Sequence, residues 1–227
     1  MTHAVRTSLL QTSGTTLLVR PQLSTTRCRN RRLIMASSAP PPVIGAGTAH
    51  DVQTLSSRKE TLRRMYEECQ KAFPSVQDIT CNQLQDLLQA SDPVVLVDVR
   101  SPEEQRVSVL PGNVVHKEDF DGHQQEYSNH KIVTYCTIGA RSGKYAQQLT
   151  DQGVPQVYNL RGSIIAWTQE GYPLVNGDDR QTPTTQVHTF GKQWDLVGDG
   201  YQSIQYGAIQ GNVELVRSVL PRVLGGR

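Results

Sequence analysis

Short apolar runs alternate with longer segments of helical periodicity between residues 75 and 176. Runs of this length that are rich in valine, leucine and isoleucine are typical of buried strands. Strands that alternate with helices form parallel sheets. We therefore expect the α/β fold class, with a central, mostly parallel five-stranded sheet and helices on both faces. The predicted strands are residues 76–79, 94–97, 113–116, 132–135 and 157–160.

Capping residues mark where the helices of this region begin. Thr80 is expected to cap the helix after the first strand, and Pro102 begins a short helix or turn after the second. Ser142 is expected to be the N-cap of a helix that extends to about residue 152. A last helix is predicted at residues 164–170. In parallel sheets ligands bind at the carboxyl ends of strands, so the residues after each strand are the first candidates for function.

A further helix is predicted before the alternating region, where Ser57 and Glu60 form a capping box and Pro74 ends the helix. Its apolar stripe favours packing on the domain. The residues after the alternating region are polar at first and then contain aromatic and aliphatic residues that can pack. The expected segments are a transit peptide at 1–35, a linker at 36–55, the N-terminal helix at 56–74, the main domain at 75–176, and a C-terminal extension of unknown role at 177–227.

The transit peptide is inferred from composition. The first 50 residues contain six arginines and no Asp or Glu, and residues 1–35 are rich in Ser, Thr, Arg and Leu. That composition is typical of an organelle transit peptide, and the apolar run at 17–19 is too short for a secretory signal. Richness in Ser and Thr favours the chloroplast, while the arginines leave the mitochondrion as the alternative. Met35 is an alternative start that yields an untargeted form.

Charge and cysteine usage exclude several functional classes. Removing the six N-terminal arginines from the formal charge of +2 leaves −4 for the rest of the chain, so the basic character does not indicate a nucleic-acid-binding face. The four cysteines form no CxxC pair and no zinc pattern, and the histidines show no ligand spacing. No apolar stretch is long enough to span a membrane. We expect no metal, no cofactor, no nucleic-acid partner and no membrane span.

The strongest chemical signal is the segment that follows the strand at 132–135. That strand ends at Cys136, a short loop follows, and Arg141 closes the loop where helical periodicity starts. A thiolate is the nucleophilic form of cysteine, and positive potential near the sulfur lowers the pKa of the thiol. A helix N-terminus and an arginine both supply that potential. Gly139 allows a cramped turn. This pattern predicts a nucleophilic cysteine in an anion-binding loop rather than a structural one.

The length of the loop indicates what the cysteine carries. Four residues separate Cys136 from Arg141, namely Thr137, Ile138, Gly139 and Ala140. A ring this tight suits one extra sulfur atom on the cysteine, which is a persulfide. A tetrahedral phosphoryl group is larger and should need at least one more residue.

Three motifs together resemble the rhodanese-type sulfurtransferases. Residues 136–142, Cys-Thr-Ile-Gly-Ala-Arg-Ser, are similar to the active-site loop of that family, Cys-x-x-Gly-x-Arg-Ser/Thr. The segment from Asp98 to Arg100 resembles its Asp-Val-Arg motif, and residues 159–173 resemble its closing motif. The resemblance covers residues 75–176, and Ser163 stands where the family has the second glycine of the closing motif.

The resemblance implies a rhodanese-like fold and sulfurtransferase activity without a cofactor. In this hypothesis Cys136 is catalytic and takes a sulfane sulfur from a small anionic donor such as thiosulfate. A thiol or a protein cysteine then accepts the sulfur from the persulfide. Arg141 is expected to bind the donor and to favour the thiolate. The predicted substrate-binding residues are Thr137, Ile138, Gly139, Ala140, Arg141 and Ser142.

Two other functions remain open on the sequence. The same fold can serve as a phosphatase or an arsenate reductase, although the short loop argues against both. A regulatory or scaffold module is the third reading, and an intact Cys136 and Arg141 argue against it. Asp98 and Arg100 are expected to form a structural ion pair, and Arg161 is expected to be a solvated surface residue.

Overall fold

The computed structural model describes residues 54–205 of the chain. The predicted transit peptide, nearly all of the predicted linker and residues 206–227 of the predicted extension lie outside the described residues.

A five-stranded sheet forms the centre of the domain. Its order is β1-β5-β4-β2-β3, and every neighbouring pair is parallel. The predicted α/β fold class with a five-stranded sheet is therefore confirmed, and this sheet is parallel throughout. Its strands are β1 (Gln77–Ile79), β2 (Val94–Asp98), β3 (Val114–His116), β4 (Lys131–Tyr135) and β5 (Val157–Leu160).

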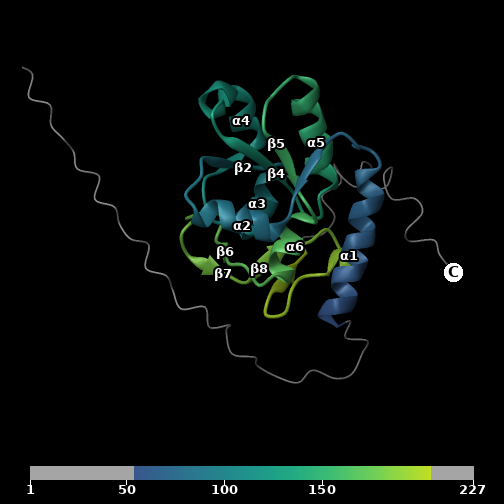
Figure 1. The fold of residues 1–227 in the computed structure, drawn as a ribbon. Coiled ribbons are helices and arrows are strands. Elements are labelled where there is room, and N and C mark those ends of the chain that lie inside the picture. Colours follow the sequence, from purple (N-terminus) through teal and green to yellow (C-terminus); the bar gives the residue numbers. More distant parts are fainter. Residues whose placement is uncertain (1–53, 206–227) are drawn as a thin grey trace, which may run out of the picture. The chain divides into compact units, whose positions relative to one another are not determined.

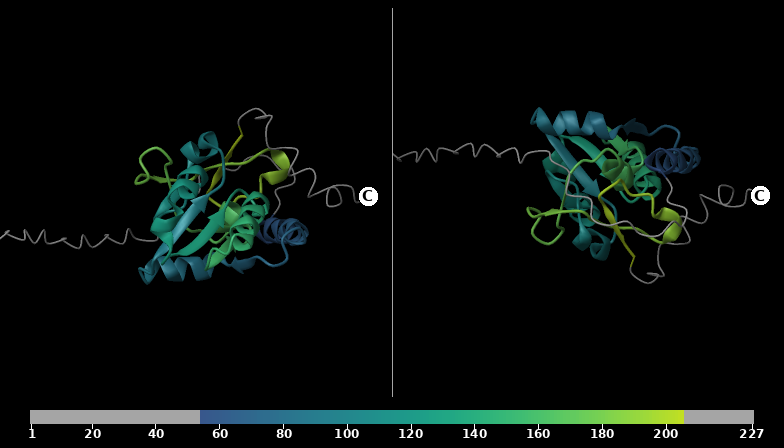
Figure 2. Two further views of the ribbon diagram at one scale, coloured as in Figure 1. Left: turned by 90° about the horizontal axis from the view of Figure 1, so that it is seen from above. Right: turned by 90° about the horizontal axis from the view of Figure 1, so that it is seen from below.

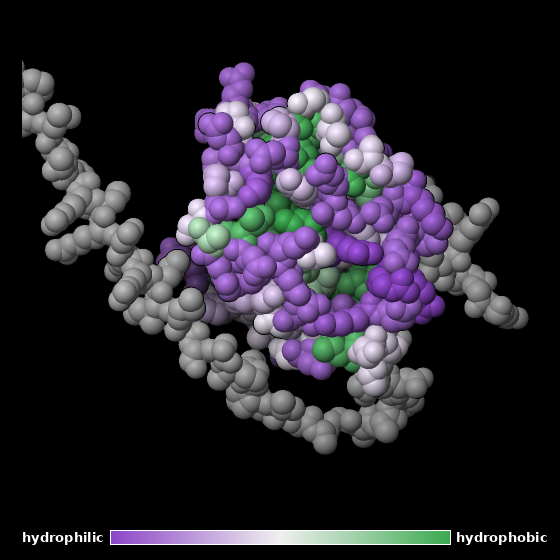
Figure 3. Space-filling model, viewed as in Figure 1, coloured by the Kyte–Doolittle hydropathy of each residue, from purple (hydrophilic) through white to green (hydrophobic). Residues whose placement is uncertain are grey.

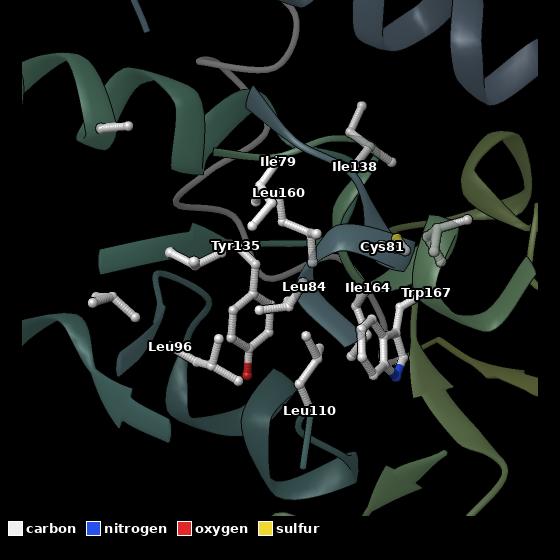
Figure 4. Packing of buried hydrophobic residues seen from close by; sticks show 14 of the residues in the cluster. Ile79, Cys81, Leu84, Leu96, Leu110, Tyr135, Ile138, Leu160, Ile164 and Trp167 are labelled. Atoms are coloured by element: carbon white, nitrogen blue, oxygen red, sulfur yellow. The ribbon is translucent and has the colours of Figure 1, made fainter. Parts of the chain in front are cut away.

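The buried strands have side chains covered on both sides. All five residues of β2 are buried, and successive side chains of a strand point to opposite faces, so both faces of the sheet are covered at β2. Trp167 and Ile164 pack into the same core from the helix that follows β5. Figure 4 shows Leu96, Tyr135 and Leu160, from three different strands, converging with these two residues.

Helices and short 3-10 turns connect the strands. They are α1 (Leu55–Gln70), α2 (Cys81–Gln89), α3 (Pro102–Val107), α4 (Lys117–His123), η1 (Gln124–Tyr127), α5 (Ala140–Asp151), α6 (Ser163–Gln169) and η2 (Lys192–Trp194).

The predicted start of α2 is confirmed and that of α1 is wrong. Thr80 is the N-cap of α2 and forms a capping box with Gln83. In α1 the N-cap is Thr54, whose side chain accepts a hydrogen bond from the Ser57 N–H at 3.2 Å. Ser57 therefore lies inside the first turn, and Glu60 bonds to Arg63 instead of closing a capping box. Thr54, three residues before Ser57, thus accepts a hydrogen bond from one of the unpaired N–H groups at the start of the helix.

Helix α1 packs beside the helices that follow β4 and β5. It contacts α5 and α6, and α5 lies on β4 and β5 (Figures 1 and 2). Its buried residues include Leu62, Met65, Tyr66 and Cys69, which confirms that the apolar stripe packs on the domain. The face in Figure 3 is mostly hydrophilic, with smaller apolar patches between the hydrophilic residues. Among residues 54–205, no helix has the length and apolar character required to cross a membrane.

The described part of the C-terminal extension folds back onto the domain. Strands β6 (Leu174–Val175) and β7 (Pro183–Thr184) pair antiparallel, and β8 (Gln186–His188) pairs parallel with β9 (Gln202–Ile204). Helix α3 contacts β8. Trp194, Leu196 and Val197 are buried in the same core as the sheet. Residues 177–205 are therefore built into the domain.

Candidate active site

Cys136 lies directly after β4, at the carboxyl edge of the parallel sheet. The chain turns there and enters α5, whose N-cap is Gly139. Gly139 has φ +104°, and a Cβ on it would lie 2.5 Å from Cε2 of Tyr66. A left-handed backbone and this close approach both require glycine. The predicted N-cap Ser142 is wrong, because the turn at Gly139 starts the helix earlier and places Ser142 in its first turn.

Two hydrogen-bond donors face the sulfur of Cys136. The Gly139 N–H lies 3.2 Å from Sγ, and Oγ of Ser142 lies 3.5 Å from it. Ser142 Oγ also lies 2.7 Å from Oδ1 of Asn159, so its single proton is shared between the two acceptors. The side chain of Asn159, at the carboxyl end of β5, in turn donates to the Gly139 carbonyl at 3.1 Å. The loop is held in shape by this buried network.

The environment of Cys136 lowers the pKa of its thiol. Burial by itself raises that pKa, but the charge of Arg141 and hydrogen bonds from Ser142 and Gly139 outweigh it. The other two described cysteines show the opposite effect. Burial raises the pKa of Cys69 and of Cys81 to about 12. Of the three thiols in residues 54–205, Cys136 is the one whose pKa is lowered, which favours its thiolate form.

Arg141 is paired with a buried carboxylate. Its Nη1 and Nη2 donate to the two carboxylate oxygens of Glu104, both at 2.8 Å, and Nη2 also lies 3.1 Å from Oγ1 of Thr137. Burial opposes the charged form of Glu104, but the bonds to Arg141 hold the pKa of Glu104 well below its usual range. His188 Nδ1 lies 3.6 Å from the same carboxylate. Glu104 and Arg141 are therefore both charged, and the carboxylate of Glu104 largely compensates the charge of Arg141.

A cavity of about 10 Å³ lies over Cys136. A space of that size holds about one water-sized atom. Only 1% of the Cys136 surface is exposed. Five of the lining residues come from the loop region, namely Cys136, Thr137, Ile138, Ala140 and Arg141, and two come from the C-terminal extension, Phe190 and Trp194.

Comparison with known proteins agrees with this geometry. The sequence model of the rhodanese-like domain family matches residues 80–170. A sulfurtransferase of Allochromatium vinosum is 34% identical over 102 residues, which are 44% of this chain and 95% of that protein. The chain belongs to the rhodanese-like family. It contains a rhodanese-like domain that resembles a sulfurtransferase over nearly that protein's whole length.

The chain is also similar to a protein with a different named activity and to a solved rhodanese-like structure. A tRNA uridine(34) hydroxylase of Ruegeria pomeroyi is 28% identical over 143 residues, which are 58% of this chain but 43% of that protein. The crystal structure of a rhodanese-like domain protein from Staphylococcus aureus has 30% identity and a TM-score of 0.36, and it covers 42% of this chain and 95% of that one.

The departure at Ser163 from the usual rhodanese closing motif has a structural consequence. Ser163 has φ +52°, a left-handed conformation that is unusual for a residue with a side chain. Its Oγ accepts the backbone N–H of Cys136 at 3.1 Å and donates to the Leu160 carbonyl at 3.2 Å. The Ile164 N–H binds the Cys136 carbonyl at 3.3 Å. The first turn of α6 therefore fixes the backbone of the cysteine.

Three other rhodanese-motif residues have the roles expected of structural or solvated side chains. Asp98 and Arg100 form a buried ion pair at 2.6 Å, and Arg100 also donates to the Ser108 carbonyl. Arg161 does not line the Cys136 cavity and lies on the surface, 3.7 Å from Glu67. Within residues 54–205, no group of His, Cys, Asp and Glu side chains is arranged to hold a metal ion.

Sequence reasoning did not identify several residues of the rhodanese site. Nothing local in the sequence signals that Glu104 contacts Arg141, 37 residues away. Asn159 is the one amide residue in the predicted strand 157–160, and a polar residue that is buried near the end of a strand is the signal that points to it. Phe190 and Trp194 lie in the extension, which the motifs do not cover.

Proposed function

We propose that this protein is a sulfurtransferase that carries a sulfane sulfur as a persulfide on Cys136. The observation that supports the proposal is the environment of Sγ. It combines a lowered thiol pKa, a donor from Gly139 at 3.2 Å and space for about one further atom. This combination matches the needs of a thiolate that takes up one sulfur and of a persulfide that is then held in the loop.

The reaction has two displacement steps. The Cys136 thiolate attacks the outer sulfur of the donor, the new S–S bond forms, and the donor's S–S bond breaks with its electron pair on the leaving group. With thiosulfate the leaving group is sulfite, and the charge stays on the persulfide. In the second step an acceptor thiolate attacks the outer persulfide sulfur, and the Cys136 thiolate leaves. This is covalent catalysis, in which the sulfur atom passes first from the donor to Cys136 and then from Cys136 to the acceptor.

The loop residues have different roles in this proposal. The Gly139 N–H and the Ser142 hydroxyl stabilise negative charge on the sulfur. Arg141 supports the thiolate through its charge, and its bonds to Glu104 and Thr137 hold the loop closed. The sequence predicts that Arg141 binds the anionic donor directly. Because the Nη atoms of Arg141 already bind Glu104 and Thr137, we propose that Arg141 contributes less to donor binding than to the thiolate and the loop. Thr137, Ile138 and Ala140 form the wall of the cavity.

The alternatives from the sequence are less well supported. A phosphoryl or arsenate group has a tetrahedral set of oxygens, and the cavity of about 10 Å³ holds about one atom. A regulatory module needs no reactive thiol, whereas the pKa of Cys136 is lowered despite complete burial. Both observations favour sulfur transfer.

Turnover with matched substrates tests the proposal. Purified protein is mixed with thiosulfate and cyanide in one assay and with an aryl phosphate in another. We expect thiocyanate to form and the aryl phosphate to stay intact, and we expect Cys136→Ala to form no thiocyanate. Hydrolysis of the phosphate without thiocyanate formation would support the phosphatase instead.

We also propose that residues 1–35 direct the protein to the chloroplast, with the mitochondrion as the alternative. The acid-free, Ser-, Thr- and Arg-rich composition supports this. Fusion of residues 1–50 to a fluorescent protein in plant cells tests it. Fluorescence that remains in the cytosol would contradict the proposal.

A further inference from the structure

We propose that Phe190 and Trp194 select the sulfur donor by size, and that compact persulfides reach Cys136 in preference to bulky ones. The inference rests on the proposed sulfur transfer and names two specificity-determining residues outside the region matched by the family, residues 80–170. Both belong to residues 186–198, which we call the cover segment.

The cover segment closes the site over the sulfur. Phe190 and Trp194 line the cavity opposite the Cys136 loop, and they leave about 10 Å³ between them and the loop. The guanidinium of Arg141 lies 4.5 Å from the centre of the Phe190 ring, a cation–π contact. The closed site therefore holds a persulfide sulfur but no donor molecule. A donor enters by displacing part of the cover segment.

The two aromatic residues differ in how firmly they are held. Trp194 is 5% exposed and packs in the core with Leu196 and Val197. Phe190 is only half-buried, so its ring lies between the cavity and solvent. Rotation of this ring gives up its contacts with Arg141 and His188 but leaves the backbone of the segment in place, and it opens a narrow path. A wider path requires the backbone of the segment to move.

Specific contacts oppose that backbone movement. The side-chain amide of Gln169 donates to the Leu196 carbonyl at 2.6 Å, and the Gly198 N–H donates to Oγ1 of Thr168 at 3.0 Å. A Cβ on Gly198 would lie 1.9 Å from the Thr168 carbonyl oxygen, so the segment lies directly against α6. A bulky donor must break these contacts, whereas a compact one needs only the Phe190 ring to move. The size selectivity follows from this difference.

Two variants change the cover segment in different ways. Phe190→Ala removes the ring and widens the opening. Gly198→Ala leaves both aromatic residues intact but forces the segment away from α6, because its new Cβ overlaps the Thr168 carbonyl. Gly191→Ala is the matched control. It lies in the same segment, its φ of 163° is extended, and a Cβ there would meet nothing within 4 Å.

The experiment compares two donors with the same reactive group, cysteine persulfide and glutathione persulfide. Sulfur transfer to Cys136 is followed by intact mass, and the ratio of the two rate constants is measured. A change in thiolate reactivity affects both donors alike, so the ratio reports access. We expect Phe190→Ala and Gly198→Ala to raise the rate for glutathione persulfide relative to cysteine persulfide by about tenfold, and Gly191→Ala to leave the ratio unchanged. An unchanged ratio in both variants would overturn the proposal.

Alkylation separates this proposal from the proposed function. The rates at which N-methylmaleimide and N-(1-pyrenyl)maleimide modify Cys136 are measured on the folded proteins. The same two variants should favour the larger reagent relative to wild type. If wild type accepts sulfur from no donor, the proposed function fails, yet the maleimide ratio still shows whether the cover segment selects by size. An equal ratio in wild type and both variants would exclude the selection.

Discussion

The two terminal nitrogens of Arg141 donate to the two carboxylate oxygens of Glu104, each at 2.8 Å. The two side chains are 7% and 2% exposed, so the pair is almost completely removed from solvent. Arg141 lowers the pKa of Cys136. Because Glu104 carries the opposite charge and binds Arg141 directly, we expect it to offset part of that effect. The pair therefore adjusts the reactivity of the sulfur as well as the shape of the loop.

Substitutions of this pair should shift the pKa of Cys136 in opposite directions. Arg141→Gln removes the positive charge and leaves Glu104, so the pKa of Cys136 should rise. Glu104→Gln leaves Arg141 uncompensated, so the pKa should fall below that of wild type. The measurement is the pH dependence of the rate at which iodoacetamide alkylates Cys136.

Folding must be checked in both variants, because removal of one partner of a buried ion pair costs about 3–5 kcal/mol. Circular dichroism at each pH provides this check. Shifts in the same direction for the two folded variants would contradict the assigned roles of Arg141 and Glu104.

The cysteines of the described region should differ sharply in reactivity. Between pH 6 and 8, Cys136 should be the most rapidly alkylated of the three, because burial raises the pKa of Cys69 and Cys81 to about 12 while the pKa of Cys136 is lowered. Alkylation at increasing times, followed by peptide mass spectrometry, gives each rate. Equal rates at the three sites in folded protein would be inconsistent with a poised thiolate.

The lowered pKa also predicts how stability depends on pH. Where the folded state has lost the Cys136 proton and the unfolded state has kept it, unfolding takes up a proton, so stability rises with pH. This contribution is complete above the unfolded-state pKa and is lost as the pH falls through the folded-state pKa. The difference in unfolding free energy between wild type and Cys136→Ala should therefore grow as the pH rises towards 9. A difference that is constant with pH would argue against a lowered pKa.

Ser163 should be replaceable by glycine more readily than by alanine. Both substitutions remove the oxygen that accepts the Cys136 N–H, and an unpaired buried N–H costs about 1–3 kcal/mol. In the alanine variant the Cβ also makes the left-handed backbone at φ +52° energetically unfavourable, whereas glycine adopts this conformation without that cost. Urea unfolding of Ser163→Gly and Ser163→Ala measures both costs. Equal or greater stability of the alanine variant would show that the backbone at this position is not strained.

The buried pair of Asp98 and Arg100 should contribute far more to stability than an exposed pair. Both side chains have no exposed surface, so Arg100→Met leaves a buried carboxylate without its partner and should cost about 3–5 kcal/mol. Arg63→Ala is the control. Arg63 is about half exposed and pairs with Glu60 and Glu67, and exposed pairs of this kind contribute little to stability. Similar losses in urea unfolding for the two variants would contradict the structural role assigned to Arg100.

The sequence predicts those parts of the fold that local patterns determine. The apolar runs predicted all five strands, and Thr80 correctly marked the start of α2. Helix α4 was not predicted, because its seven residues include Gly122 and bury only Phe120. Cap preferences favour serine and so predict Ser142 as an N-cap, but a glycine with φ +104° satisfies the geometry three residues earlier.

The site could be predicted only in part for a related reason. Cys136 and its loop are contiguous in sequence, so their spacing alone indicates chemistry. Glu104 and the cover segment reach the loop through tertiary contacts, and no periodicity or spacing encodes those contacts. The sequence therefore indicates Cys136 as the candidate nucleophile and Arg141 as its positive charge, but not the carboxylate that compensates the charge or the aromatic residues that line the cavity.

Sulfur loading of Cys136 is the most direct test of sulfur transfer. Wild type and Cys136→Ala are mixed with thiosulfate or with a thiol persulfide, and their intact masses are measured without reduction. We predict that wild type gains the mass of one sulfur atom, that the added sulfur is on the peptide containing Cys136, and that Cys136→Ala gains none. Equal labelling of the two proteins, or no labelling of folded wild type by any donor, would contradict the account.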